Sequence, residues 1–524
     1  MTQPRVFLRE ATGLVRQFTW YDAMALSMAV SGPVTFGIVG NVGYVIPNNP
    51  GANLPIAMMI GFLFWIPVGL LYYLLTVQMP RSGGDYVWLG RGLHPILGFV
   101  GGWVMFISFV ALLSSASVTQ PAVVVPDIAV AMGYSLHNPG LISWGQSLAS
   151  STTNIFLGTL LTIICGFVIA SLPAKFYSHV MLAITAVILA STVVFMAVFA
   201  TASSESFISG LSSMTNGSVT VDGTIAQAAE AGLTYVPLNL TSTFAAVPFG
   251  VLLFNGFTYS AYFAGEVKNV RWSMMWGMFS ALIACGLVDI IGIYYLMGVM
   301  GYPFVQATFA LFGAGKFSLG VPPWAPVFLP AVSSSPYLVA FMELGFFLYN
   351  PWWAAGLCIC LSRYIFAFSF DRVLPTFFAD VNDRLHIPLK GIGLAFVFAV
   401  IFAYIAVYTS YIGQLLNTVV IWTIVWVLLG ITAIVITFWR KELARNVLGG
   451  RWLLPICGFL TVVGMATTFY WANTIPAIGP SNLGSAMLLI VIFASGAVIY
   501  LVRYFYFKGK GIDLIDIQRE IPPE

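Results

Sequence analysis

The stretch Ser31-Gly32-Pro33-Val34-Thr35-Phe36-Gly37 lies in the middle of an apolar segment that runs from about residue 21 to residue 46. A membrane-spanning helix needs roughly 20 mostly apolar residues, so this segment is long enough to cross a bilayer. Pro33 has no backbone N–H and its ring clashes with the preceding turn, while Gly32 leaves the backbone free just before it. The sequence therefore predicts a transmembrane helix that is interrupted at mid-membrane depth.

A second interrupted helix is expected at residues 243–265, where Pro248 is followed by the triplet Asn255-Gly256-Phe257. An amide side chain beside a glycine is costly in mid-bilayer unless it lines a wet cavity or is buried in protein. Each interruption alone is equally consistent with a kink packed through glycine. The two spans, however, hold the first place in two successive groups of five, and such a matched pair indicates an inverted-repeat transporter with its binding site at the breaks.

The composition of the 524-residue chain supports a membrane protein. Hydrophobic residues make up 59% and charged residues 7%, and the mean hydropathy is +0.93, whereas a soluble domain carries about 25% charged residues. Disorder is excluded because it needs low hydrophobicity and high charge. The net charge of +3 is scattered between apolar segments and gives no reason to expect a nucleic-acid partner. We therefore expect an all-α polytopic membrane protein that contacts the lipid bilayer and a small-molecule substrate.

Twelve transmembrane spans are predicted from the apolar segments. They lie near residues 21–46, 54–78, 96–126, 153–172, 176–200, 243–265, 272–300, 336–366, 391–410, 412–438, 453–474 and 484–506. With the N-terminus inside, every Lys and Arg except Lys316 falls on the inner side, as the positive-inside rule predicts. One span more or fewer would reverse every later loop and destroy this asymmetry. We therefore expect a multi-pass protein of the cell membrane with both termini cytoplasmic.

The spans divide the chain into six consecutive regions. These are a cytoplasmic N-terminal segment at 1–20, a first five-helix repeat at 21–200, an extracellular loop at 201–242, a second five-helix repeat at 243–438, two additional transmembrane helices at 439–506 and a cytoplasmic tail at 507–524. None of these features specifies an oligomeric state.

Three stretches resemble the hallmark sequences of amino acid permeases of the amino acid–polyamine–organocation (APC) superfamily. They are residues 80–87 (PRSGGDYV) after the second span, residues 254–269 (FNGFTYSAYFAGEVKN) through the end of the sixth, and residues 362–375 (SRYIFAFSFDRVLP) leaving the eighth. Their order and inner-side positions are specific to the superfamily and do not identify a substrate. The resemblance implies a leucine-transporter-like fold, with a 5+5 inverted repeat and 12 transmembrane helices.

The same resemblance implies where the substrate binds. In this family, backbone amides at the first break hold the substrate carboxylate, and carbonyl groups at the sixth-helix break hold its amine. Carried over, the carboxylate site is Ser31, Gly32, Pro33, Val34 and Thr35, and the amine and side-chain site is Phe254, Asn255, Gly256 and Phe257. The family usually has a Gly-x-Gly-like triplet in the first helix. Here Pro33 cannot donate, so one amide contact is missing.

Two acids lie well inside predicted spans, Asp289 in the seventh and Glu343 in the eighth. A charge at the bilayer centre costs about 2.5–3.5 kcal/mol, so such acids usually face a cavity or are neutral. Both are candidates for a coupling or cation-binding site, and the alternative is a structural acid that is protonated or wetted by a vestibule. No metal site is expected.

The choice of coupling ion rests on two further positions. Sodium-binding relatives use hydroxyl groups of the eighth helix, whereas residues 352–360 contain no Ser or Thr. Other relatives place a lysine on the fifth helix, where this chain has Ile188. The prediction therefore favours proton coupling or uncoupled exchange over sodium, with no cofactor.

The inner-side motifs predict a cytoplasmic gate formed by Arg81, Asp85, Glu266, Lys268 and Arg363. Asp85 is expected to pair with a base such as Arg363 or Lys268, and Gly83-Gly84 lets the chain bend. The alternative is a solvated loop whose exposed ion pairs are worth ~0–1 kcal/mol each.

The predicted function is a secondary active transporter that moves an amino acid, a polyamine or a related amine by alternating access. The alternative is a channel or uncoupled facilitator for a small polar solute, although a channel would show a repeated filter sequence or rings of charge. An enzyme is not expected, because the four histidines His94, His137, His179 and His386 are spread near span ends rather than clustered at depth.

Overall fold

The computed structural model describes residues 16–32, 35–382, 385, 387–409, 418–440, 442–443, 448–474 and 483–519. Within these ranges the regular elements are all helical, and eleven helices are long and apolar enough to cross a membrane. The long helices are α3 (Leu54–Gln78), α5–η2–α6 (Pro95–Ser135), α8 (Thr152–Ala170), α9 (Ala174–Thr201), α12–η3 (Leu240–Glu266), α13 (Val270–Met300), α16 (Pro336–Phe370), α17 (Leu389–Tyr408), α19 (Thr418–Trp439), α20 (Leu453–Ala472) and α21 (Leu483–Lys508). The expectation of an all-α polytopic membrane protein is confirmed.

The first predicted span is built from shorter pieces and so is not among the eleven. It consists of α1 (Trp20–Ser31), a π-helix η1 (Thr35–Gly40) and α2 (Asn41–Asn48). Gly32 caps α1 in the left-handed conformation, with φ of 63°. Only glycine adopts this backbone geometry at little cost, so the residue type fixes the place where the helix stops.

The third predicted span is longer than expected. A π-helical turn, η2 (Gln120–Val124), joins α5 (Pro95–Thr119) to α6 (Val125–Ser135), so the helix continues well past residue 126. The whole run has 41 residues, and at about 1.5 Å per residue this is about twice the ~30 Å thickness of a bilayer core. One end of this rod therefore projects beyond the apolar layer.

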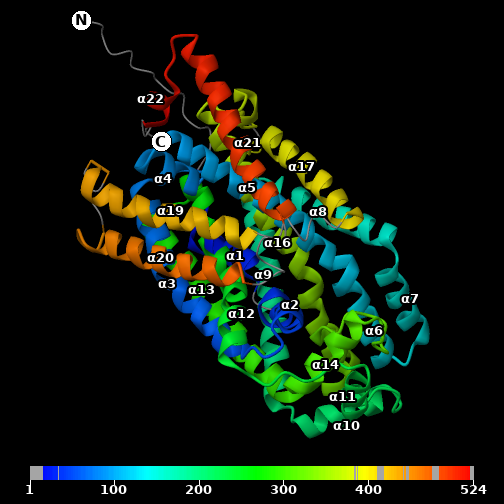
Figure 1. The fold of residues 1–524 in the computed structure, drawn as a ribbon. Coiled ribbons are helices and arrows are strands. Elements are labelled where there is room, and N and C mark those ends of the chain that lie inside the picture. The colour runs from blue at the N-terminus through cyan, green and yellow to red at the C-terminus, as the bar shows by residue number, and fades with distance from the viewer. Residues whose placement is uncertain are drawn as a thin grey trace, which may run out of the picture.

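Short helices collect at the two ends of the bundle (Figure 1). At one end lie α10 (Ser204–Met214), α11 (Val221–Glu230), α14 (Tyr302–Gly313), and, packed on α6, the short η4 (Ala325–Phe328), α15 (Leu329–Val332) and α7 (Pro139–Ser150). At the opposite end α22 (Leu514–Arg519) packs on α4 (Asp85–Gly92). The region expected as an extracellular loop thus contains two helices of its own.

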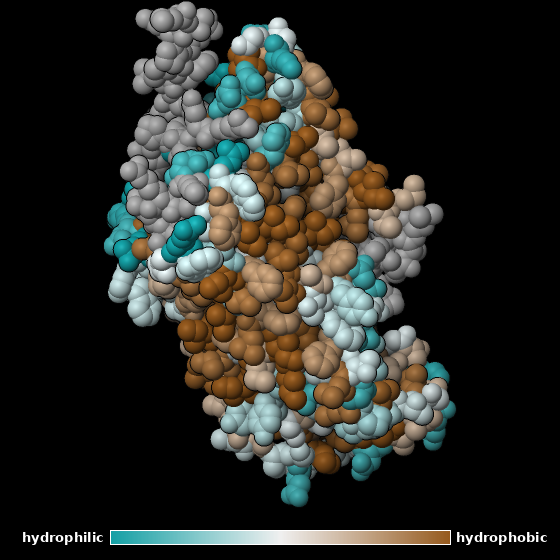
Figure 2. All heavy atoms as spheres, turned by 60° about the vertical axis from the view of Figure 1, so that its left-hand side comes forward, coloured by the Kyte–Doolittle hydropathy of each residue, from teal (hydrophilic) through white to brown (hydrophobic). Residues whose placement is uncertain are grey.

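The outer surface of the bundle is apolar. Figure 2 shows hydrophobic side chains gathered over the middle of one face, with hydrophilic side chains towards its two ends. Leu161 on α8 is 63% exposed and Ile490 on α21 is 67% exposed. A water-soluble monomer rarely exposes such a contiguous apolar area, and lipid chains are the natural cover for it.

Candidate functional site

The first break is defined by backbone hydrogen bonds on either side of it. Gly32 N–H donates to the carbonyl of Met28 at 2.9 Å and closes α1. Gly37 N–H donates to the carbonyl of Gly32 at 2.6 Å, and the Asn41 side-chain amide donates to the carbonyl of Gly37 at 2.6 Å. Pro33 and Val34, and the side chains of Thr35 and Phe36, lie outside the described residues. The predicted interruption is present, and Gly32 and Gly37 frame it.

The second break is a change of helix type. The α-helix α12 ends at Phe254, and a 3-10 helix, η3, runs over Asn255–Glu266. The Asn255 side-chain amide donates back to the carbonyl of Leu252, while its Oδ1 is buried without a hydrogen bond among the described residues. The sequence predicted an interruption at this position. The structure shows there a change from α-helix to 3-10 helix and a buried acceptor, Asn255 Oδ1, without a described partner.

The rings of Phe254 and Phe257 both face α3. The Phe254 ring packs edge-on to Phe62 at 5.9 Å, and the Phe257 ring packs edge-on to Trp65 at 5.4 Å. A Cβ added at Gly69 would lie 2.7 Å from the Phe257 ring, so the glycine on α3 makes room for it. The two aromatic side chains therefore anchor this segment to α3.

The two breaks touch each other through glycine. A Cβ added at Gly256 would overlap the backbone of Val30 and Ser31, the last residues of α1. One helical turn further along η3, the hydroxyl groups of Ser27 and Ser260 are 3.1 Å apart and hydrogen-bonded. This close approach brings together the residues that the sequence placed in one binding site, although they are more than 200 positions apart.

An acid and a tyrosine from two other helices lie against the first break. A Cβ at Gly37 would overlap Oδ1 of Asp289 on α13, and a Cβ at Gly32 would overlap the hydroxyl of Tyr349 on α16. Asp289 is fully buried, and neither of its carboxylate oxygens has a hydrogen-bond partner in the described part of the chain. Sequence analysis identified Asp289 but missed Tyr349, because only packing shows that its hydroxyl lies over Gly32.

Several buried polar atoms on neighbouring helices also lack partners among the described residues. They are Ser31 Oγ, Asn255 Oδ1, Tyr259 Oη, Trp352 Nε1 and Trp422 Nε1. The Tyr259 ring stacks on Phe109 at 4.7 Å, and Trp422 packs edge-on to the same ring at 5.8 Å. Unsatisfied polar groups are rare inside proteins, so a set of them calls for an explanation such as a ligand. Tyr259 lies in the hallmark stretch, whereas no sequence signal marks Trp422.

Asp289 and Glu343, which the sequence grouped as one candidate coupling site, have different surroundings. Asp289 lies beside Gly37, whereas Glu343 on α16 interacts electrostatically with Asp127 on α6. Glu343 and Asp127 are 2% and 0% exposed. Asp127 was not singled out because the predicted third span ended at residue 126.

The end of the bundle where α4 and α22 lie, which the sequence predicts to face inside and which is called the inner end below, carries a buried ion pair. Arg363 Nε donates to Glu266 Oε1 at 2.6 Å, and Arg363 Nη2 donates to Glu266 Oε2 at 2.7 Å. Arg363 and Glu266 are 1% and 2% exposed. This two-pronged pair links the end of η3 to α16, which ties the sixth helix to the eighth.

Within the described part of the chain, Asp85 is bonded by tyrosines and not by Arg363 or Lys268, so the expected pairing with either base is not found. Its Oδ2 accepts hydrogen bonds from the hydroxyls of Tyr262 at 2.6 Å and Tyr364 at 3.4 Å. The sequence could not show that Arg363 Nε and Nη2 both donate to Glu266. Burial raises the pKa of Asp85 to about 6, and hydrogen bonds from Tyr262, Tyr72 and Tyr364 offset part of this increase.

The glycines before Asp85 allow its close approach to the gate. Gly83 and Gly84 have φ of 108° and 46°. A Cβ at Gly84 would lie 2.6 Å from the Tyr262 ring, and one at Gly83 would lie 2.8 Å from Ala367. The bend expected at this pair is present, and it lets the loop contact both η3 and α16.

The segment before α1 also joins the inner end. Phe18 and Val267 form a parallel bridge, in which Phe18 N–H donates to the Glu266 carbonyl at 3.1 Å and Lys268 N–H donates to the Phe18 carbonyl at 2.8 Å. Arg81 is 9% exposed, whereas Lys268 is exposed and borders a cavity of about 300 Å³ with Asp22 and other residues of α1 and α9. The predicted gate residues thus gather at one end, and Arg363 and Glu266 form an ion pair there.

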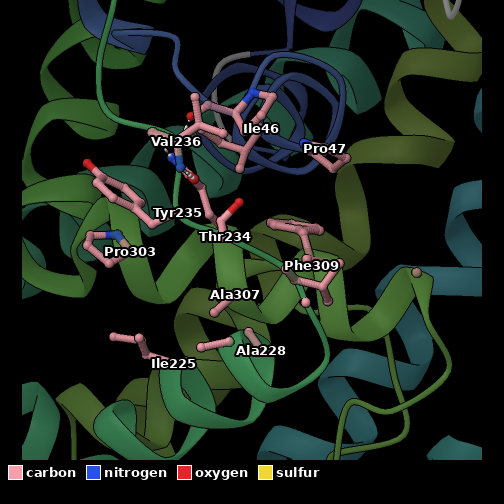
Figure 3. Close-up of a pocket in the computed structure, with 17 residues that line it drawn as sticks. Ile46, Pro47, Ile225, Ala228, Thr234, Tyr235, Val236, Pro303, Ala307 and Phe309 are labelled. Atoms are coloured by element: carbon pink, nitrogen blue, oxygen red, sulfur yellow. Dashed lines mark hydrogen bonds between the residues drawn. The ribbon is translucent and has the colours of Figure 1, made fainter.

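A larger cavity of about 680 Å³ lies at the opposite end of the bundle. Figure 3 shows Ile46 and Pro47 of the first span facing Ile225 and Ala228 of α11 and Ala307 of α14 across it. Its lining is largely apolar, and none of the predicted substrate residues belongs to it.

Comparison with known proteins agrees with this arrangement. Residues 18–497 match the family of amino acid permeases. The chain belongs to the amino acid permease family. The match covers all but the ends of the chain, and it makes the protein a membrane transporter of small molecules rather than an enzyme. The resemblance to APC-superfamily permeases is confirmed.

A curated relative of this permease has no assigned role. It is the uncharacterized protein 399 of Sulfolobus islandicus rod-shaped virus 1, which is 24% identical over 383 residues. The aligned region covers 72% of this chain and 70% of the viral protein. The similarity extends the family relationship but says nothing about a substrate.

The contact at Gly256 predicts a strict size limit. Gly256→Ala should lower the thermal midpoint of the purified permease, because a methyl group meets backbone atoms that cannot rotate away and overpacking costs about 1–3 kcal/mol. The matched control is Gly393→Ala on α17, where an added Cβ meets nothing within 4 Å. Equal melting of Gly256→Ala and the parent protein would contradict the close approach.

The Arg363–Glu266 pair predicts a strongly non-additive double-mutant cycle. Glu266→Gln leaves a buried guanidinium without its counter-charge and should destabilise the protein by about 3–5 kcal/mol. The cycle consists of Glu266→Met, Arg363→Met and the double variant. The double variant should lose less stability than Glu266→Met alone, because no charge remains buried. Thermal melts of the three variants measure this, and additive losses would refute the pair.

The Asp85 cluster predicts a pH-dependent stability. With a folded-state pKa of about 6 against an ordinary value of 3.8, the contribution of Asp85 is fully present below pH 3.8 and is lost as pH rises through 6. The thermal midpoint should therefore fall across this window, and Asp85→Asn should flatten the fall. Asp222→Asn on exposed α11 is the control, and a profile unchanged by Asp85→Asn would disprove the assignment.

Proposed function

We propose that this permease is a secondary active transporter that moves an amino acid or a related amine by alternating access, with the substrate held where α1 and α12 end. The observation that carries the proposal is the contact between Gly256 and the Val30–Ser31 backbone, which brings the two breaks together in the interior. We also propose the orientation given by the positive-inside rule, with α10, α11 and α14 outside and α4 and α22 inside.

The chemistry around the breaks favours a cationic group on the substrate. The C-terminus of α1, at Ser31, lies there, and C-terminal helix ends carry partial negative charge. Asn255 Oδ1 and the Asp289 carboxylate add further acceptors without described partners. An ammonium group satisfies all of these, whereas an anion without an amine would be repelled. A carboxylate would be held by amides of the first helix beyond Gly32, as the family resemblance implies.

The aromatic residues supply the rest of the proposed pocket. Tyr259, Trp352 and Trp422 combine apolar rings with buried polar atoms that have no described partner. Such groups can donate to or accept from a small polar ligand while excluding water. Phe254 and Phe257 act instead through α3, so we assign them to the support of the site, with backbone atoms facing the substrate.

The closed inner end supports a carrier rather than a channel. The Arg363–Glu266 pair, the Asp85–tyrosine cluster and the Phe18 bridge all join elements that would separate for release to the inside. A channel that opens by a small local movement needs no such extensive seal. An uncoupled facilitator for a small polar solute is the alternative, and saturable counterflow of labelled amino acid in proteoliposomes distinguishes the two, because linear flux would refute the carrier.

We propose Asp289 as the coupling acid, and a proton as the coupling ion. It lies against the first break, where protonation and substrate occupancy can influence each other. The position on α9 where some relatives have a lysine is a buried isoleucine, Ile188, and therefore offers no amine. If Asp289 couples transport, Asp289→Asn should remove the acceleration of uptake by external acid while substrate exchange continues.

The unpartnered hydroxyl of Ser31 gives a test that separates binding from folding. Ser31→Ala should leave the thermal midpoint unchanged or raised, because a buried hydroxyl without a partner does not stabilise the fold. It should weaken the substrate-induced thermal shift, by up to about tenfold in affinity if one hydrogen bond is lost.

The control for this test is Ser108→Ala, whose hydroxyl donates to its own helix at Val104. A screen of amino acids and polyamines by thermal shift supplies the ligand. Unaltered affinity in Ser31→Ala would remove Ser31 from the proposed site.

A further inference from the structure

Two facing helices carry a stripe of polar residues outside the proposed substrate site. On the α5–η2–α6 rod the stripe is Gln120 and Asp127, and on α16 it is Asn350 and Glu343. The two members on each helix are seven residues apart (120 to 127 and 343 to 350), which is about two helical turns and returns to the same face. The helices run antiparallel, so Gln120 meets Asn350 and Asp127 meets Glu343.

In the inner half of the stripe, both side-chain amide groups donate hydrogen bonds. The Asn350 amide donates to Gln120 Oε1 at 2.8 Å and to Thr119 Oγ1 at 3.2 Å, and the Gln120 amide donates to the carbonyl of Phe347 at 3.1 Å. These bonds fix the register of the two helices. Asn350 Oδ1 remains buried with no partner in the described ranges.

The outer half of the stripe is not satisfied. Asp127 and Glu343 are 0% and 2% exposed, they interact electrostatically, and none of their four carboxylate oxygens has a hydrogen-bond partner among the described residues. Two carboxylates buried on facing helices in a low-dielectric interior cannot both remain ionised without a compensating positive charge. Something must therefore neutralise at least one of them.

The neighbouring elements offer no base for this purpose. The short elements packed on α6, which are α7, η2, η4 and α15, contain no Asp, Glu, Lys, Arg or His. The helices α5 and α8, which pack on α16, also contain no Asp, Glu, Lys, Arg or His. Within α16 itself, the titratable residues nearest in sequence to Glu343 are Tyr337 and Tyr349. On α9, Lys175 and His179 lie in the first two turns, whereas Ser191, far along the helix, contacts Gly345.

The remaining charges near α16 are committed elsewhere or distant. Arg363 is bonded to Glu266 at the other end of α16, about 30 Å from Glu343 at 1.5 Å per residue. Lys390 on α17 pairs with Asp380 at 2.6 Å, also at the inner end. Asp22 on α1 and Glu266 on η3 lie at that end too.

We propose that Asp127 and Glu343 form a second proton-binding site, a carboxyl pair at the outer end of the α6–α16 interface that is protonated while buried and ionises when the outer end opens. The site is distinct from the substrate breaks, and its existence does not depend on the proposed substrate; its outward position rests on the orientation proposed above. The π-turn at Gln120–Val124, directly before α6, is the element at which this end of the rod can shift, since such turns often mark functional positions.

This arrangement links the opening of the outer end to proton release. Each conformational cycle that wets the pair lets at least one carboxyl lose its proton to the outside, and closure takes it back. Low external pH then favours the closed form and high pH favours the open form. If one proton is released, the equilibrium between the two forms changes by up to about tenfold for each pH unit.

Infrared difference spectroscopy of the purified permease tests the pair without substrate or transport. Titration from acid to alkaline pH should show loss of the carboxylic C=O stretching band assigned to buried acids. All variants are compared in an Asp85→Asn, Asp289→Asn background, because these two acids are also buried and would add to the band. In that background Asp127→Asn and Glu343→Gln should each reduce the signal, and the double variant should remove what the pair contributes. Exposed Glu205→Gln on α10 is the control.

Stability and ion dependence complete the test. The double variant should fold, because the neutral side chains mimic the protonated pair, and its thermal midpoint should depend less on pH than that of the Asp85→Asn, Asp289→Asn background. Unchanged infrared bands in the double variant would overturn the proposal. Sodium chloride, compared with choline chloride, should not stabilise the parent selectively, and a sodium-specific gain lost in the double variant would make this a metal-cation site instead. Failure of the amino acid screen would affect only the proposed substrate.

Discussion

The structure depends on the requirement that every backbone polar group inside a bilayer be satisfied within the protein. The permease meets this with long helices, of which α1 ends at Gly32 and α12 changes to a 3-10 helix at Asn255. Both changes lie in the interior, and the contact of Gly256 with the end of α1 puts them against each other. A helix end exposed to lipid would be prohibitively expensive, whereas a helix end facing another helix end creates a small polar region that a ligand can satisfy.

The inner end shows how such a region can be closed. Each of the three hallmark stretches contributes. The Gly83-Gly84 bend of the first brings Asp85 to Tyr262 of the second, and Arg363 of the third donates hydrogen bonds to Glu266 of the second. The segment at Phe18 adds a backbone bridge to the residue that follows Glu266. The glycine pair is needed because larger residues would overlap Tyr262 and Ala367. The motifs that identify the family are therefore the parts of three distant segments that contact one another.

Four buried acids, for which the described residues show no basic partner, occupy three different environments. Asp85 is held by tyrosine hydroxyls outside the membrane-spanning helices, Asp289 on α13 lies against the interrupted first helix, and Glu343 and Asp127 lie on two facing helices. In each case the acid is buried beside conformationally adaptable backbone: a glycine bend, a helix break or a π-turn. Protonation at such places can shift the balance between two arrangements, which is what a transporter that couples two gradients requires.

The sequence by itself determined the class, the family and the positions of the helices, because hydropathy and lipid exposure follow directly from composition, and because Pro33, Gly32 and Gly256 carry their backbone properties wherever they fall. It also predicted the end of α1 at Gly32, whereas the substrate site and the cytoplasmic gate remain predictions. It could not assign partners, because pairings depend on which faces of distant helices meet. Arg363 pairs with Glu266 rather than with Asp85, and Asp127 lies on the helix that faces Glu343. The length of the third helix was missed for a related reason, because α6 is covered by α7, η4 and α15 rather than by lipid. Tertiary packing alone decided those contacts, since local sequence sets where a helix runs and where it stops, whereas its neighbours decide what each side chain touches.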